Sequence, residues 1–213
     1  AYQRDPQAID HWQRVAYPAI AAQARKDGAE VFFWDESGFR ADAVHGKTWS
    51  KRGQTPVVDR PGQRQSISAA SAVNSKGAFW FQTYPGALTG ELFVELLKKL
   101  MHRRKKAVHL VVDGLPAHKK AVVKQYVAST NGRLTLHCLP GYAPELNPDE
   151  LVWSHTQRTG VARRPLHKGE KLEQRRSVVS LQADFDRQGH RAECQPPGAV
   201  TCSHRRSSAV RNV

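Results

Sequence analysis

Short hydrophobic runs alternate with polar segments along the first 157 residues, and their spacing predicts a series of helices and strands. Apolar side chains recur near helical spacing over residues 7–27, where Pro18 is expected to interrupt the helix. The aromatic run VFFW at 31–34 predicts a short buried strand that ends at Asp35.

A hairpin and a helix are predicted next. Residues 66–74 and 78–84 flank the turn sequence Ser-Lys-Gly at 75–77, as in an antiparallel pair of strands. Thr89 is suited to cap a helix, and large apolar side chains follow it at helical spacing up to Met101. The basic run HRRKK at 102–106 complements the carboxyl end of that helix dipole.

The remaining pattern alternates strand and helix. Residues 108–112 (VHLVV) predict a second buried strand that ends in a carboxylate, Asp113. A helix follows and stops near Asn131-Gly132, residues 134–139 predict another strand, and Asn147-Pro148 opens a last helix. Antiparallel strands followed by helix-separated strands indicate an α/β fold with a mixed sheet flanked by helices.

Length and composition agree with one globular domain and an appendage. The chain has 213 residues, of which 39% are hydrophobic and 24% charged. We find no apolar run long enough to cross a bilayer and no secretory signal in the first residues. Three scattered cysteines disfavour a disulfide scaffold or a zinc site and suit a reducing cytosol.

The net charge of +14 favours a polyanionic partner, most often nucleic acid. Residues 1–157 carry 21 basic and 14 acidic side chains, and residues 158–213 carry 12 and 5. The final segment is also rich in Pro, Ser and Arg and poor in apolar periodicity. We therefore expect residues 174–213 to form a basic, poorly ordered tail.

Three carboxylates stand out against this pattern. Asp35 and Asp113 each follow a hydrophobic strand, and Glu150 lies in the first turn of the last helix. Carboxylates without neighbouring Cys or His ligands suit a hard cation such as Mg²⁺ or Mn²⁺. Each also has a purely structural interpretation: an Asp after a strand is commonly a turn residue, and Glu150 completes a capping box with Asn147.

Four segments carry a family resemblance: FFWDESGFR at 32–40, KTWSKRGQTPVV at 47–58, VVDGLPAHKK at 111–120 and LPGYAPELNPDELVWSHTQR at 139–158. They resemble the DDE transposases of bacterial insertion sequences, in the mariner-like branch, and the resemblance covers roughly residues 1–173. It implies an RNase H-like fold whose triad maps onto Asp35, Asp113 and Glu150. The expected catalytic domain spans residues 31–173, after a helical lead-in of residues 1–30.

The resemblance also implies an activity and partners. A transposase catalytic domain performs metal-dependent cleavage and strand transfer on double-stranded DNA, with two Mg²⁺ or Mn²⁺ ions held by the triad. It further implies a homodimer when full length and a location in the bacterial cytoplasm, at the nucleoid. Two alternatives stay open: a catalytically dead DNA-binding remnant, and an RNase H-like nuclease acting on RNA–DNA hybrids.

Other polar residues near the triad are secondary candidates. Glu36 and Asp149 are neighbours of triad residues but should face away from them. The resemblance implies an outer role near the metal for His118 and Asn147, and we expect Trp153 to pack in the core. Basic residues that could line a DNA groove are Arg40, Lys47, Lys51, Arg52, Lys119 and Lys120.

Both ends of the chain depart from the family pattern. The stretch before residue 30 is too short for the helix-turn-helix region that reads terminal repeats, so we expect no sequence choice from this chain. After residue 173 the resemblance fades. The sequence there resembles translation in a shifted reading frame or a decayed copy, and a divergent natural tail stays open as an alternative.

Overall fold

The computed structural model describes residues 4–40, 49–54, 57 and 65–159. The predictions for Lys47 and for the tail at 174–213 lie outside these residues. The centre of the described part is a five-stranded sheet with the strand order β3-β2-β1-β4-β5. Its strands are β1 (Glu30–Arg40), β2 (Ser66–Asn74), β3 (Phe79–Tyr84), β4 (Val108–Val112) and β5 (Leu134–Cys138).

The sheet is mixed, as predicted. Strand β2 runs antiparallel to both of its neighbours, β1 and β3. Strands β1, β4 and β5 run parallel to one another. The parallel strands are joined through helices, as such connections require. The α/β prediction with antiparallel strands first and parallel strands later is confirmed.

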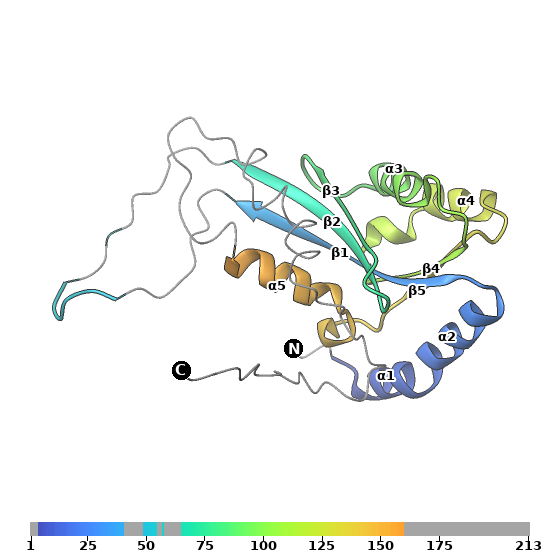
Figure 1. Cartoon of the computed structure of the whole chain (residues 1–213), viewed down its shortest axis with the longest axis horizontal. Helices are drawn as coiled ribbons and strands as arrows, with labels where there is room; N and C mark the ends of the chain where they lie inside the picture. Colours follow the sequence, from blue (N-terminus) through green and yellow to red (C-terminus); the bar gives the residue numbers. More distant parts are fainter. Residues whose placement is uncertain (1–3, 41–48, 55–56, 58–64, 160–213) are drawn as a thin grey trace, which may run out of the picture.

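Helices cover both faces of this sheet (Figure 1). The helices α3 (Gly90–Met101) and α4 (Ala121–Ser129) lie on one face, and the 3₁₀ helix η2 (Pro116–Lys119) leads from β4 into α4. The other face carries α1 (Pro6–His11), α2 (Tyr17–Lys26) and α5 (Asp149–Thr159). Two short elements complete the set: a π-helical segment, η1 (Trp12–Ala16), and the 3₁₀ helix η3 (Pro144–Leu146).

Successive side chains of β1 point alternately to the two helical layers. Phe32 and Trp34 are fully buried against α3 and α4, where Phe93 meets the Trp34 ring edge-on at 5.3 Å between ring centroids. Phe33 points the other way and packs with Trp12 and Tyr17 of the amino-terminal helices. The buried aromatic run thus anchors both layers to the strand that carries Asp35.

The prediction that the first strand ends at Asp35 is wrong. β1 continues to Arg40 because its polar half pairs with β2, from Asp35 opposite Ser71 to Arg40 opposite Ser66. Backbone hydrogen bonds hold this half in the ladder whatever the polarity of its side chains. Asp35 is therefore a residue within a strand.

The predicted interruption at Pro18 takes the form of a π-helical segment, which separates α1 from α2 without ending the helical run. The Tyr17 N–H bonds to the carbonyl of Trp12, five residues back, and Pro18 occupies the first turn of α2. Proline lacks a backbone N–H, but an N–H in the first turn of a helix has no partner within that helix. Pro18 is therefore tolerated, and α2 continues to Lys26.

Candidate active site

Asp35 lies within β1, and Asp113 directly follows the neighbouring strand β4. The two strands pair in parallel up to Phe33 beside Val111, and each acid lies two residues beyond that last pair. The carboxyl end of β4 therefore opens beside the middle of β1, which is the kind of position where ligands gather in α/β sheets.

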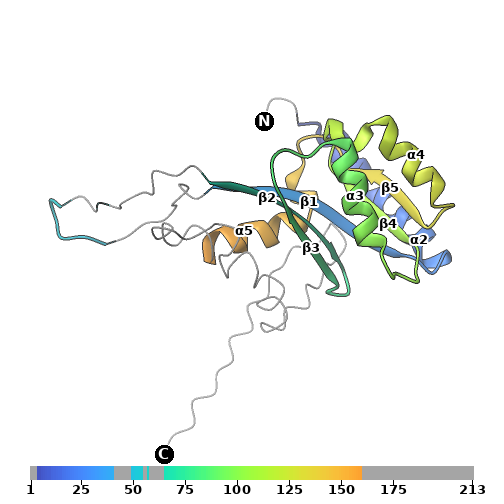
Figure 2. The ribbon, with the colours of Figure 1, turned by 90° about the horizontal axis from the view of Figure 1, so that it is seen from above.

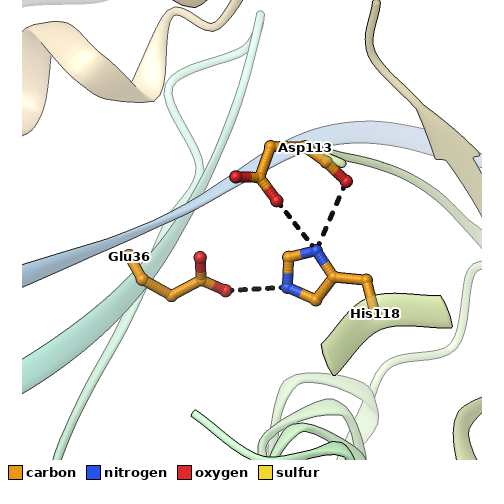
Figure 3. Close-up of side chains that lie close together, drawn as sticks. All are labelled: Glu36, Asp113 and His118. Atoms are coloured by element: carbon orange, nitrogen blue, oxygen red, sulfur yellow. Dashed lines mark hydrogen bonds and ion pairs between the residues drawn. The ribbon is translucent and has the colours of Figure 1, made fainter. Parts of the chain in front are cut away.

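Glu36, Asp113 and His118 form a cluster on the α3–α4 face (Figure 3). His118 Nε2 lies 2.9 Å from Glu36 Oε1, and its Nδ1 lies 3.0 Å from Asp113 Oδ1. The buried imidazole, on η2, packs against Phe93 at 4.3 Å between ring centroids. One ligand atom from each residue lies within 4.8 Å of the others, a spacing that could hold a metal ion.

The imidazole balances charge within this cluster. Burial alone would lower the pKa of His118, but the hydrogen bonds to Asp113 and Glu36 raise it to about 9. Burial would raise the pKa of Asp113, but hydrogen bonds from His118 and from the Leu115 N–H lower it. At neutral pH an imidazolium therefore lies between two carboxylates and donates to both.

The opposite face holds a second set of acids around the start of α5. Asp149 is fully buried, and the Ser71 hydroxyl lies 2.8 and 2.9 Å from its two carboxylate oxygens. Ser71 pairs with Asp35 across β1 and β2, so the tie fixes the first turn of α5 beside Asp35. Glu150, the next residue, is exposed.

Asn147 fastens this helix start from a second side. Its side-chain amide donates to the carbonyl of Trp34 at 3.1 Å, and its side-chain oxygen accepts from the Asp149 N–H at 3.2 Å. The predicted cap is thus confirmed, and it also bonds to β1 one residue before Asp35. Trp153, predicted as core, is buried against Phe39 and Phe81.

The carboxyl of Asp35 lies in a negative environment. Burial, followed by the charge of Glu150 and smaller effects of Glu36 and Asp113, raises its pKa to about 8. Burial likewise raises the pKa of Asp149, although the Ser71 hydroxyl opposes the shift. The charges of the other two acids of the predicted triad, Glu150 and Asp113, therefore both act on Asp35.

Asp149 was predicted to face elsewhere, but it is buried close to Asp35: burial, and then the charges of Asp35 and Glu36, raise its pKa. The meeting of Glu36 with His118 and Asp113 was not predicted; the only signal was the His five residues after Asp113. Of the proposed DNA-groove residues, the described ones, all of them exposed, are Arg40, Lys51, Arg52, Lys119 and Lys120.

A family model described as the DDE superfamily endonucleases matches residues 30–173. The chain belongs to this family. The matched range contains the whole sheet and every acid of the two clusters described above. No curated protein matches the chain.

The fold of this DDE-family chain is that of the Mos1 mariner transposase. The Mos1 strand transfer complex has 14% identity and a TM-score of 0.59, with 86% of this chain and 61% of that chain covered. The Mos1 paired-end complex with Mg has 13% identity and a TM-score of 0.57, with 87% and 62% covered. The isolated Mos1 catalytic domain has 12% identity and a TM-score of 0.52, with 86% and 92% covered.

This chain therefore spans less than two thirds of the Mos1 chains in those complexes and most of the isolated catalytic domain. The shared sheet confirms the RNase H-like prediction. Within the described residues, no helix is both long enough and apolar enough to cross a membrane.

Proposed function

We propose that this chain is the catalytic domain of a transposase that cleaves and joins DNA strands with Mg²⁺ or Mn²⁺. One observation carries the proposal. Asp35 is held in the sheet where burial, then the charge of Glu150 and smaller effects of Glu36 and Asp113, raise its pKa to about 8. Family membership and the Mos1-like fold supply the class of reaction, and this convergence of acids supplies its location.

The donor set fits hard divalent cations. Carboxylate oxygens are the ligands that Mg²⁺ and Mn²⁺ prefer, and acids that repel one another gain most from a bound cation. Asp35, Asp113 and Glu150 would hold one or two ions. When bound, such ions polarise a phosphodiester and activate the attacking oxygen. The Mos1 structures include paired-end complexes with Mg and with Mn.

The remaining residues of the site hold these acids in place. His118 fixes Asp113 through its Nδ1–H and Glu36 through its Nε2–H. On the other face, Asn147 and the Ser71–Asp149 pair hold the first turn of α5, which carries Glu150, against β1 and β2. Outer contacts of this kind orient ligands and tune their basicity.

Double-stranded DNA is the proposed substrate. One Mos1 structure is a paired-end complex with the left transposon end, and the net charge of this chain suits a polyanion. In-line attack at the phosphodiester needs no covalent protein–DNA intermediate. Exposed Arg40, Lys51 and Arg52 would contact the phosphates, the full-length protein would act as a homodimer, and its place in the cell would be the nucleoid.

A nicking assay tests the function. The purified chain should nick supercoiled DNA with Mg²⁺ or Mn²⁺ and not with EDTA, and Asp113→Asn should abolish nicking while DNA binding persists. Asp10→Asn, an exposed acid paired with Arg14, is the matched control and should nick normally. Retained nicking in Asp113→Asn would overturn the site.

The same assay separates the two alternatives. Binding without nicking by the unaltered chain would show a catalytically dead remnant. Faster cleavage of an RNA–DNA hybrid than of duplex DNA would show a nuclease of the RNase H type.

A further inference from the structure

We propose that a second surface, at the end of the sheet opposite the carboxylates, binds the phosphates of duplex DNA. This surface, the basic end, consists of residues 25–30, 102–107 and 130–133. These are the connections that precede β1, β4 and β5, so they lie where the three parallel strands begin. The polyanion is taken to be DNA because the proposed function acts on DNA.

Backbone hydrogen bonds join the three connections into one surface. The Glu30 N–H donates to the Ala107 carbonyl at 2.9 Å, and the Val108 N–H donates to the Arg133 carbonyl at 2.8 Å. In both views the connections lie together at one end of the molecule, away from α5 and the far end of β1 (Figures 1 and 2).

The basic end is strongly cationic. It holds seven Lys and Arg residues and two carboxylates, Asp27 and Glu30. Glu30 lies 3.6 Å from both Arg104 and Lys106, and Asp27 lies 3.6 Å from the ring of His109. The other five cations of this surface are exposed: Arg25, Lys26, Arg103, Lys105 and Arg133.

Arg104 gives this surface its shape. Its guanidinium lies over the Phe32 ring at 4.5 Å, and its Nε–H donates to the Leu100 carbonyl at 2.8 Å. Arg133 in turn donates to the Arg104 carbonyl, which ties the last two connections together. Arg104 is thus a structural residue, and its neighbours Arg103 and Lys105 are exposed.

The backbone at Arg103 supports a role for its side chain. Arg103 follows the cap of α3 with a φ of 57°, in the left-handed region where helices usually place glycine or asparagine. The neighbouring connection follows that rule with Asn131 at a φ of 51°. An arginine at such a position is disfavoured by the backbone, which makes its side chain the first one to test.

The basic end is separate from the carboxylates. Glu30 and Glu36 are six residues apart on β1, which corresponds to about 20 Å along the strand. That length is about six base pairs of duplex, at about 3.4 Å per step. The basic end would therefore contact phosphates that are distant from the cleaved bond. Such contacts would carry no sequence information.

The test is duplex binding measured as a function of salt. Fluorescence anisotropy with a 30-base-pair duplex, in EDTA and at 50–300 mM salt, gives the slope of log affinity against log salt. Arg103→Ala with Lys105→Ala should reduce that slope by about 2 and weaken binding about tenfold or more at 100 mM. Arg14→Ala, which removes an exposed cation from the amino-terminal helices, is the charge control.

Arg103→Gly is the sharper variant, because glycine relieves the backbone while removing the charge. It should melt at the same temperature as the unaltered chain or higher, yet bind duplex more weakly. Asn131→Gly makes the same backbone change without loss of charge and should bind normally.

Equal binding by the double variant and Arg14→Ala would overturn the proposal. So would unchanged duplex binding together with lost binding of polyglutamate, which would indicate an acidic protein partner instead. Nicking by the unaltered chain reports on the proposed function independently, since either result can occur without the other.

Discussion

The two faces of β1 treat neighbouring acids in opposite ways. Glu36 points to the α3–α4 face, where the His118 imidazolium lies 2.9 Å from its carboxylate and the Trp34 indole N–H also donates to it. Asp35 points to the α5 face, where burial and the charge of Glu150 raise its pKa to about 8. One acid has a cation supplied by the protein, and the other is surrounded by further acids.

This difference shows which acid depends on an external cation. Glu36 is already compensated, so its main effect is to hold His118 and, through His118, Asp113. Asp35 gains the most from a bound ion, because each neighbouring carboxylate that disfavours its charge would be offset by that ion. The comparison yields four predictions.

The largest expected difference is in catalysis. Asp35→Asn should reduce metal-dependent nicking below detection, because it removes a proposed metal ligand. Glu36→Gln should retain measurable nicking, reduced about 10- to 100-fold, as is typical when a group that orients a ligand is lost. Rates at saturating Mg²⁺ with a supercoiled plasmid would provide the measurement.

The opposite ranking of the two variants would assign the metal to the other face of β1. If Glu36→Gln were inactive and Asp35→Asn active, the metal would belong to the cluster of Glu36, Asp113 and His118. Circular dichroism of both variants would check that each remains folded.

Metal binding should also stabilise the fold. At a free Mg²⁺ concentration of about 100 times its dissociation constant, stability should rise by about 2.7 kcal/mol. Asp35→Asn should lose most of that gain. Without metal it should be more stable than the unaltered chain at neutral pH, because it removes a buried carboxyl that has to keep its proton on folding. Melting temperatures with Mg²⁺ and with EDTA would measure both effects, and an equal Mg²⁺ response in the two proteins would contradict the assignment.

The sequence was sufficient to predict the sheet, and it places two of the three motif acids at element boundaries. Strand β4 is a short, wholly apolar run, and Asn147-Pro148 is a strong helix start, so Asp113 and Glu150 fall at recognisable boundaries. The end of β1 could not be predicted, because its polar half is held by backbone pairing with β2, which leaves no hydrophobic signal in residues 35–38.

Contacts between residues that are distant in the chain could not be predicted from the sequence either. Alternation along a strand separates Asp35 from Glu36, but it cannot show that His118, 82 residues later, turns back onto Glu36. Helical spacing turns Asp149 away from Glu150, but its partner Ser71 is 78 residues earlier. Such pairings follow from the packing of η2 and α5 on the sheet.

The Ser71–Asp149 pair offers a test of how the Asp35 face is built. Ser71→Ala should cost about 1–3 kcal/mol in the free energy of unfolding, because it removes the hydroxyl partner of a fully buried carboxyl. Ser66→Ala, an exposed position on the same strand, is the control and should change little. Urea denaturation would measure both, and equal stability of the two variants would show that the pair does not anchor α5.

The last prediction is a pH dependence that distinguishes Asp35 from ordinary surface acids. The pKa of Asp35 rises from 3.8 to about 8 on folding, so between these values the folded protein retains a proton that the unfolded chain releases. Stability without metal should therefore fall as pH rises from 4 to 8, by no more than about 1.4 kcal/mol per pH unit from this group. Asparagine does not titrate, so the stability advantage of Asp35→Asn over the unaltered chain should be near zero at pH 4 and greatest at pH 8. Urea denaturation in EDTA at several pH values would measure this difference, with Asp10→Asn as the exposed control. An advantage that stays constant across the range would show that Asp35 is charged in the folded protein and that its neighbours do not act on it as inferred.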